Sequence, residues 1–419
     1  MGLALREYAA PQRAYELSDA TITGLPCVRA QYNEGTGARL PWKELQKALR
    51  RYRKQGLPSL YPDHSLLSEF KKQLAEYSGV QPEQVQVFHG SDALLEKVAL
   101  VASLGRLPFR SAGPSPGRRA SFLVLGPTYS QALNLPARLG CRVVEARGPA
   151  PFFRPDPGEF ASVIESLKPD VVYICNPNNP TGLVTKPEII KDLCKRNPET
   201  LFLLDEAYVE FDGLSSAGLI SSLSNLAVAR TFSKAFALAD QRLGYLLAGQ
   251  TMQNVLKPFV NDKDVTTESM IYGLGVLRNP GYMHDYVKAV RGQRCRVADI
   301  LKSHGFEPLS EAGNFVAFHV PQERTRQFLE RCEYYGLQLR DLSRLSPGMV
   351  RISLIGETET DYFERVFPRF SDPGSDRNCA WLDWGYPQAR DRFLFPPDIS
   401  MMFKLADHLW ELHRRRQNK

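Results

Sequence analysis

The sequence lacks the usual marks of membrane-spanning, secreted and zinc-stabilised proteins. No apolar run reaches the roughly 18 residues that a membrane-spanning helix needs, and the first residues, Met1–Arg6, carry no secretory signal. The seven cysteines form no C-x-x-C pair, and no histidine lies at a zinc-like spacing from them. We therefore expect a cytoplasmic protein with reduced thiols, no metal site and no membrane partner.

The excess of basic residues is small. Lysine and arginine number 53 against 46 acidic residues, which gives a net charge of +7, and part of the excess lies in Arg414–Arg416. Such a basic end can bind nucleic acid, and binding to DNA that weakens as the salt concentration rises would indicate this function. Basic residues at a helix end more often stabilise the helix dipole, and a basic site also suits an anionic cofactor or substrate. We therefore expect no nucleic-acid partner.

Length and apolar patterning predict an α/β fold. A chain of 419 residues exceeds the ~250–300 residues at which single cores stop growing, so more than one domain is expected. Short apolar runs alternate with helix-period segments such as 66–77, 93–103 and 186–194, which predicts a largely parallel sheet covered by helices on both faces. The runs expected to form strands are Val85–Phe88, Ser121–Leu125, Cys141–Glu145, Asp170–Cys175, Leu201–Asp205, Leu226–Arg230 and Leu243–Ala248.

The pattern changes in the last third of the chain. A helix is expected over 282–303, followed by strands at 314–320 and 349–354 with a helix between them, which is typical of a small α+β domain. Residues 371–376 look like a linker. The expected division is an N-terminal segment at 1–50 that lines the pocket and joins the small domain, a large domain at 51–280, a small domain at 281–370 and an extension at 371–419.

Polar motifs follow two of the expected strands. His89-Gly90-Ser91-Asp92 opens a helix, where Ser91 or Asp92 would be the N-cap and the free N–H groups would bind an anion. The string N-P-N-N-P-T-G at 176–182 has two prolines and a glycine, which fix a rigid loop. Either motif alone is compatible with an ordinary cap or turn. Ligands, however, bind at the carboxyl ends of such strands.

Two further strands end in charged residues. Asp205 closes an apolar strand, where a buried carboxylate costs free energy unless a cation lies beside it. A protonated pyridine ring would be such a cation, and the carboxylate would keep the ring protonated so that it can act as an electron sink. Lys234 lies in T-F-S-K-A-F, just after another strand. A single Asp is more often a cap and a single Lys a solvated surface residue. The four motifs together, in this order at strand ends, argue against coincidence.

With these strings the chain resembles the fold-type I, PLP-dependent aminotransferases of class I/II, and most closely the histidinol-phosphate aminotransferase-like branch. The resemblance covers about residues 30–365. It implies an aspartate aminotransferase-like α/β fold, with a large PLP-binding domain built on a mostly parallel seven-stranded sheet and a smaller α+β C-terminal domain. The matching strings are Y-P-D at 61–63, H-G-S-D at 89–92, P-T-Y at 127–129, N-P-N-N-P-T-G at 176–182, D-E-A-Y at 205–208, S-K-A-F at 233–236, R-L-G-Y at 242–245 and V-R-I-S at 350–353.

The resemblance also implies the cofactor, pyridoxal 5′-phosphate (PLP), and residue roles. Lys234 would hold PLP as a Schiff base and shuttle the proton, and Asp205 would pair with the pyridine nitrogen. A homodimer acting on an amino donor and a 2-oxo acid acceptor in amino-acid biosynthesis is implied as well. The remaining expected contacts are Tyr208 and Asn179 at the phenolic oxygen, Tyr129 on the ring face, Ser91, Asp92, Ser233 and Arg242 at the phosphate, Tyr61 from the neighbouring subunit, and Arg351 with Asn33 at the substrate.

Three features depart from the family pattern. Asp240 and Gln241 stand where small and apolar residues are usual, and the string N-E-G-T-G at 33–37 replaces N-E-N-P in a pocket-lining segment. The extension beyond residue 371 has no family counterpart; its aromatic residues and the helical spacing over 399–415 predict that it packs on the body or across a dimer. These departures suggest a specialised substrate.

Two alternatives to transamination stay open on the sequence. The same scaffold supports PLP-dependent decarboxylases and oxidases, which differ in the bond that is aligned with the ring. A PLP-fold binding module without activity is the other alternative, and the presence of Lys234, Asp205 and Arg242 argues against it.

Overall fold

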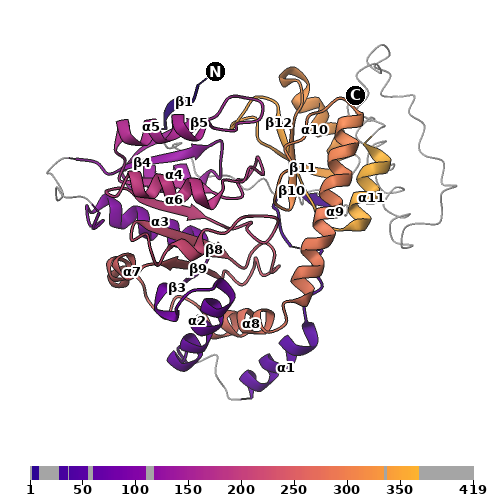
Figure 1. Cartoon of the computed structure of the whole chain (residues 1–419). Coiled ribbons are helices and arrows are strands. Elements are labelled where there is room, and N and C mark those ends of the chain that lie inside the picture. The colour runs from indigo at the N-terminus through magenta and orange to yellow at the C-terminus, as the bar shows by residue number, and fades with distance from the viewer. Residues whose placement is uncertain are drawn as a thin grey trace, which may run out of the picture.

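The protein is described from a computed structural model over residues 2–8, 28–35, 37–54, 60–109, 118–334 and 337–367. Figure 1 shows a large sheet flanked by helices and, beside it, a smaller sheet next to a long helix. The strands are β1 (Ala4–Tyr8), β2 (Val28–Ala30), β3 (Val85–Phe88), β4 (Ser121–Gly126), β5 (Arg142–Arg147), β6 (Val171–Cys175), β7 (Leu201–Asp205), β8 (Leu226–Thr231), β9 (Gly244–Ala248), β10 (Phe315–His319), β11 (Leu337–Asp341) and β12 (Met349–Ser353). The helices are α1 (Trp42–Arg53), α2 (His64–Ser78), α3 (Ser91–Ser103), α4 (Gln131–Arg138), α5 (Pro157–Leu167), α6 (Pro187–Arg196), α7 (Gln250–Leu256), α8 (Thr267–Leu277), α9 (Gly281–Ser303), α10 (Thr325–Tyr334) and α11 (Glu357–Val366).

The large sheet confirms the predicted α/β class. Its strand order is β1-β5-β4-β6-β7-β8-β9-β3. The central strands pair in parallel, and β9 is antiparallel to both of its neighbours, so β3 runs in the same direction as β8. All seven expected strands are present. The sheet has eight strands rather than seven, because β1 adds to the edge of β5 in an antiparallel register; its mostly exposed residues gave no apolar signal.

The central strands of this sheet are buried on both sides because other elements cover both of its faces. Helices α3, α4 and α7 pack on one face, around residues such as Phe122, Tyr173 and Ala229. A second apolar cluster fills the other face and continues into the small sheet, through residues such as Leu204 and Phe315. The core therefore joins the two sheets instead of stopping at the edge of the first.

The small sheet has the order β10-β12-β11-β2. Its expected strands at 314–320 and 349–354 and the helix at 282–303 are confirmed as β10, β12 and α9. Strand β11 was not predicted, and neither was β2, which brings residues 28–30 alongside β11 in parallel. Residues 28–30 of the N-terminal segment thus join the small sheet, whereas β1 of the same segment joins the large sheet. The division into domains at 50, 280 and 370 stays a prediction.

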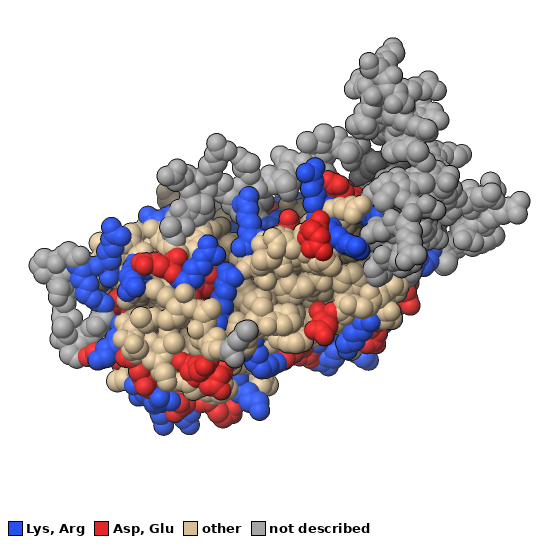
Figure 2. Space-filling model, turned by 90° about the horizontal axis from the view of Figure 1, so that it is seen from above, with Lys and Arg blue, Asp and Glu red and all other residues tan. Residues whose placement is uncertain are grey.

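Some sequence expectations fall outside the described residues, namely the linker at 371–376, the aromatic extension, the helix at 399–415 and the basic end. Within the described ranges, no helix is long and apolar enough to cross a membrane, and the five cysteines placed there are free thiols. On the face seen in Figure 2, basic and acidic side chains are interspersed.

Candidate active site

The polar motifs meet at one edge of the large sheet. Strands β3, β6, β7 and β8 run in the same direction, so the segments that follow them leave the sheet at the same edge. This is the carboxyl edge, where α/β proteins bind ligands. The small sheet supplies the opposite wall, because Arg351 on β12 contacts the loop after β6. The sequence motifs are therefore brought together as expected.

The start of α3 forms an anion cradle. The N-cap is Gly90 with φ 93°, not Ser91 or Asp92, and no side chain caps the helix. A Cβ on Gly90 would lie 2.7 Å from Nη2 of Arg242, and a Cβ on Gly244 would lie 2.9 Å from the Ser91 nitrogen. Glycine at both places lets the Arg242 guanidinium and the backbone come together. The first N–H groups of α3 and this cation suit a phosphate.

Asp205 ends β7 with its carboxylate buried at 7% exposure. The Tyr173 hydroxyl donates to one oxygen at 2.6 Å, and the Ala207 N–H donates to the other at 3.0 Å. Burial raises the pKa of Asp205 to about 6, although these two hydrogen bonds work in the opposite direction. A buried carboxylate in this state is stabilised by a cation placed beside it.

Lys234 lies in the turn after β8. Its ammonium donates to the Tyr32 carbonyl at 3.3 Å and lies 5.7 Å from the centre of the Tyr208 ring. Burial, assisted by the positive charge of Arg351, lowers the pKa of Lys234 to about 8. About a tenth of the amine is then neutral at pH 7, far more than for an ordinary lysine, and the neutral amine is the form that acts as a nucleophile or general base.

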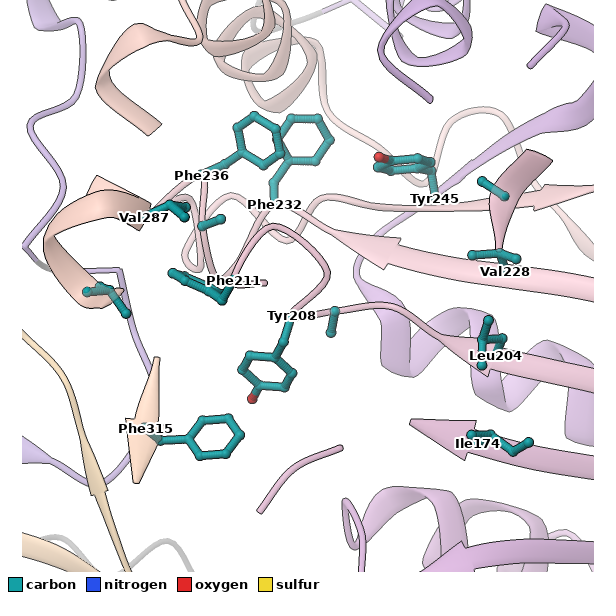
Figure 3. Packing of buried hydrophobic residues seen from close by; sticks show 14 of the residues in the cluster. Ile174, Leu204, Tyr208, Phe211, Val228, Phe232, Phe236, Tyr245, Val287 and Phe315 are labelled. Carbon is teal, nitrogen blue, oxygen red and sulfur yellow. The ribbon is translucent and has the colours of Figure 1, made fainter. Parts of the chain in front are cut away.

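A chain of hydrogen bonds links the two sheets. The Arg351 guanidinium donates to Oδ1 of Asn179 at 2.6 Å, and Nδ2 of Asn179 donates to the Tyr208 hydroxyl at 3.1 Å. Tyr208 also packs edge-on against Phe315 of β10, with ring centres 5.2 Å apart (Figure 3). Burial lowers the pKa of Arg351 to about 10 and raises that of Tyr208. The Nε atom of Arg351 is buried and has no hydrogen-bond partner among the described residues, so this cation can donate one more hydrogen bond.

Two more predicted residues lie at this edge with local partners. Tyr129 donates its hydroxyl to Asp92 at 3.0 Å, and burial together with the Asp92 charge raises the Tyr129 pKa. Ser233 is buried, and its hydroxyl accepts from the Thr231 hydroxyl at 3.0 Å. Tyr129 is therefore tied to the helix that forms the anion cradle.

Two residues differ in setting from the rest. Asn33 is 1% exposed, and its amide contacts Tyr208 and Ser353 rather than open space. Tyr61 is 77% exposed and its ring contacts the Lys263 ammonium, 4.3 Å from the ring centre. Tyr61 thus has Lys263, rather than any of the other predicted site residues, as its contact in the described part of the chain.

Sequence reasoning missed the second layer of this site. Tyr173 was available as a signal, because a tyrosine in a buried strand needs a partner for its hydroxyl. Ser353 shares a strand face with Arg351, two residues away on β12. The contacts of Gln31 and Tyr32 are made by backbone carbonyls, which residue identity does not report.

The comparisons with known proteins agree with this geometry. Residues 30–367 match the family of class I and II aminotransferases. The chain belongs to this family. It is 30% identical to histidinol-phosphate aminotransferase from Thermoanaerobacter pseudethanolicus over 76% of this chain and 87% of that protein. It is 27% identical to dihydroxyacetone phosphate transaminase from Campylobacter jejuni over 86% and 93% of the two chains.

A solved structure shows the same fold. Histidinol-phosphate aminotransferase from Sinorhizobium meliloti, in complex with pyridoxal 5′-phosphate, matches with a TM-score of 0.70 at 23% identity, covering 86% of this chain and 99% of that one. The chain is thus a PLP-dependent aminotransferase, which acts on small amino and oxo substrates. The family favours amino-group transfer over the decarboxylase, oxidase and inactive alternatives.

The described residues fit PLP. The cradle at Gly90 and Gly244 would be filled by a Cβ on either residue, and it offers N–H groups and a guanidinium to a phosphate. At the other end, Asp205 is a buried carboxylate whose pKa is raised by burial, as expected for a group that pairs with a ring cation. Lys234 lies on the same edge with a lowered pKa.

Proposed function

We propose that this aminotransferase moves an amino group between an amino acid or related amine and a 2-oxo acid, with Lys234 as the residue that holds the cofactor and moves the proton. The observation that carries the proposal is the setting of Lys234. A mostly buried lysine with its pKa lowered to about 8 meets the requirement for a nucleophile and base near neutral pH.

The other residues take roles that match their settings. When bound, PLP supplies an electrophilic carbon for the amino group and a ring that withdraws electrons from the substrate. Asp205 keeps the ring nitrogen protonated, and Arg242 with the first turn of α3 holds the phosphate. Tyr129 covers the ring face, and Tyr208 with Asn179 contacts the phenolic oxygen. Ser91, Asp92 and Ser233 complete the phosphate site.

Arg351 binds the substrate carboxylate in this proposal. Its guanidinium is already oriented by Asn179 and by the Gln31 carbonyl, and its Nε hydrogen has no partner in the part of the chain that the structure describes. A planar fork with a fixed orientation suits a carboxylate, which accepts two parallel hydrogen bonds.

We further propose that the enzyme is a cytoplasmic homodimer. Tyr61 is exposed in its own chain, which leaves its side chain accessible to a second copy, and the resemblance implies that it contacts the phosphate there. The free thiols at the described cysteines suit a reducing compartment.

The named relatives act on histidinol phosphate and dihydroxyacetone phosphate, so a phosphorylated small substrate belongs in any screen. Asp240 is exposed and Gln241 accepts from Ser269 at 3.4 Å, both at positions where the family usually has apolar residues. We propose that these departures and the N-terminal segment at 33–37 distinguish its substrate from theirs.

The test is borohydride reduction of the cofactor-loaded enzyme followed by peptide mass spectrometry. The phosphopyridoxyl group is expected on Lys234, and Lys71 is a useful internal control because it is also partly buried with a lowered pKa but lies on α2. A label on another lysine, or no label, contradicts the proposal. Amino donors are then screened for pyridoxamine phosphate, carbon dioxide and peroxide, which separate transamination from decarboxylation and oxidation.

A further inference from the structure

The Tyr208 hydroxyl receives two hydrogen bonds at once. Nδ2 of Asn179 and Nδ2 of Asn33 each donate to it at 3.1 Å. A phenolic oxygen accepts at two lone pairs and donates one hydrogen. With both lone pairs engaged, the hydroxyl hydrogen of Tyr208 must point elsewhere, and the described part of the chain records no acceptor for it.

The orientation of both amides follows from their other partners. Arginine has no acceptor, so the atom of Asn179 facing Arg351 must be its oxygen. The Ser353 hydroxyl accepts from the backbone N–H of Asn33 at 3.0 Å and donates to its Oδ1 at 2.6 Å. Ser353 therefore fixes the oxygen of Asn33 on its own side and leaves the amide N–H groups facing Tyr208.

The backbone of Asn33 is also held in place. Its φ is 54°, in the left-handed region, where asparagine is one of the few residues with a side chain that is tolerated. Nδ2 of Asn314 donates to its carbonyl at 3.1 Å. Three hydrogen bonds from the small-sheet side, two to the backbone and one to the side chain, thus hold Asn33 beside a tyrosine that follows β7 of the large sheet.

We propose that Asn33, oriented by Ser353, is a positioning residue that makes the Tyr208 hydroxyl a hydrogen-bond donor to the phenolic oxygen of the cofactor. The proposal rests on the proposed function, in which Tyr208 contacts that oxygen. It is separate from the expectation that Asn33 binds the substrate directly, which stays a prediction. Two chains of hydrogen bonds thus connect β12 with the Tyr208 hydroxyl. One runs through Ser353 and Asn33, and the other through Arg351 and Asn179.

The consequence can be measured in the absorption spectrum. A hydrogen bond donated to the ring oxygen competes with the proton shared between that oxygen and the nitrogen of Lys234. It therefore lowers the pH at which the visible band of the bound cofactor changes. Weakening the donor should raise this midpoint, independently of turnover.

The experiment is a pH titration of the visible band in cofactor-loaded wild-type enzyme and in Asn33→Gly, Tyr208→Phe and the double variant. Glycine removes the amide without strain at a positive φ. Tyr208→Phe should raise the midpoint most, and Asn33→Gly should raise it by about half to one pH unit, as expected for one lost hydrogen bond. The double variant should match Tyr208→Phe alone, because Asn33 acts through Tyr208.

Ser353→Ala provides a second, milder perturbation if Asn33→Gly folds poorly, and it should raise the midpoint in the same direction. Ser346→Ala is the matched control, since Ser346 is equally buried but bonds to His319; its midpoint should not move. An unchanged midpoint in both Asn33→Gly and Ser353→Ala overturns the inference, as does an Asn33 effect that persists in the Tyr208→Phe background. Borohydride labelling of the wild type and of each variant separates a failure of this inference from a failure of the proposed function. A wild-type enzyme without the label on Lys234 would refute the proposed function, whereas labelled enzymes with unchanged midpoints would refute only the role of Asn33.

Discussion

Replacing Asp205 with asparagine should stabilise the cofactor-free protein while disabling the enzyme. Burial holds the pKa of Asp205 at about 6, against an ordinary value of 3.8. At about 1.4 kcal/mol per pH unit, this difference corresponds to roughly 3 kcal/mol by which the ionised carboxylate destabilises the apo fold at pH 8. Asparagine removes the charge and can still accept from Ala207, and its N–H can donate to the Tyr173 oxygen.

The pH dependence has a definite sign. Because the folded pKa is higher than the unfolded one, the folded protein binds more protons between pH 3.8 and about 6. The penalty is absent below this window, grows as pH rises through it and is complete above it. The advantage of Asp205→Asn should therefore be largest at pH 8 and fall to about half at pH 5.

The assay is urea denaturation of the cofactor-free proteins at pH 5 and pH 8, repeated with PLP. With PLP bound, the wild type should regain its advantage, because the ring cation then stabilises the carboxylate. Turnover of Asp205→Asn should fall at least about a hundredfold, the scale of a lost electrostatic partner at a reacting centre. Two results would refute the reasoning: a variant that is less stable than the wild type without PLP at pH 8, or turnover within threefold of the wild type.

Three further changes test other parts of the site. Arg351→Lys should raise the KM for a carboxylate substrate at least about tenfold, because one ammonium cannot replace a planar fork; an unchanged KM in steady-state kinetics would remove Arg351 from the substrate site. Mixing Lys234→Ala with Tyr61→Ala subunits should restore native sites if Tyr61 acts across a dimer, and no recovery after verified subunit exchange would place each site within one chain. Truncation after Asp372 should lower the melting temperature and broaden the donor profile if the extension packs near the pocket; lower stability with an unchanged profile would exclude a role in selectivity, and no change in either would exclude packing.

Much of the site was predictable because its signals are local. Buried strands give continuous apolar runs, and the polar residue that ends each run marks the sheet edge, as with Asp205 at the end of β7. The elements missed have weak or ambiguous local signals. Strand β1 is mostly exposed, β2 has three residues, and β11 ends in the polar residues Arg340 and Asp341, so their pairing depends on contacts distant in sequence.

Contacts made by the backbone were equally invisible to the sequence. The carbonyls of Gln31 and Tyr32 accept from Arg351 and Lys234, and any residue has such a carbonyl. The contacts of Asn33 were not predictable for a related reason, and its expected contact with the substrate stays a prediction. An asparagine in a pocket-lining segment predicts contact with substrate, and the sequence does not report its partners within the protein, Tyr208 in the turn after β7 and Ser353 on β12, which lie more than a hundred residues away.

The departure at Gly35 follows from how closely this segment approaches the lysine turn. A Cβ there would lie 2.5 Å from the Lys234 carbonyl oxygen and 2.8 Å from the Ala237 Cα, so no side chain fits without moving the turn that carries Lys234. The family's usual asparagine at this place would push the two segments apart. Glycine instead brings the Tyr32 carbonyl within 3.3 Å of the Lys234 ammonium. The segment at 33–37, which departs from the family pattern, is therefore also the segment that lies against the turn carrying Lys234. We expect the pocket wall of this enzyme to differ from that of its relatives at this segment.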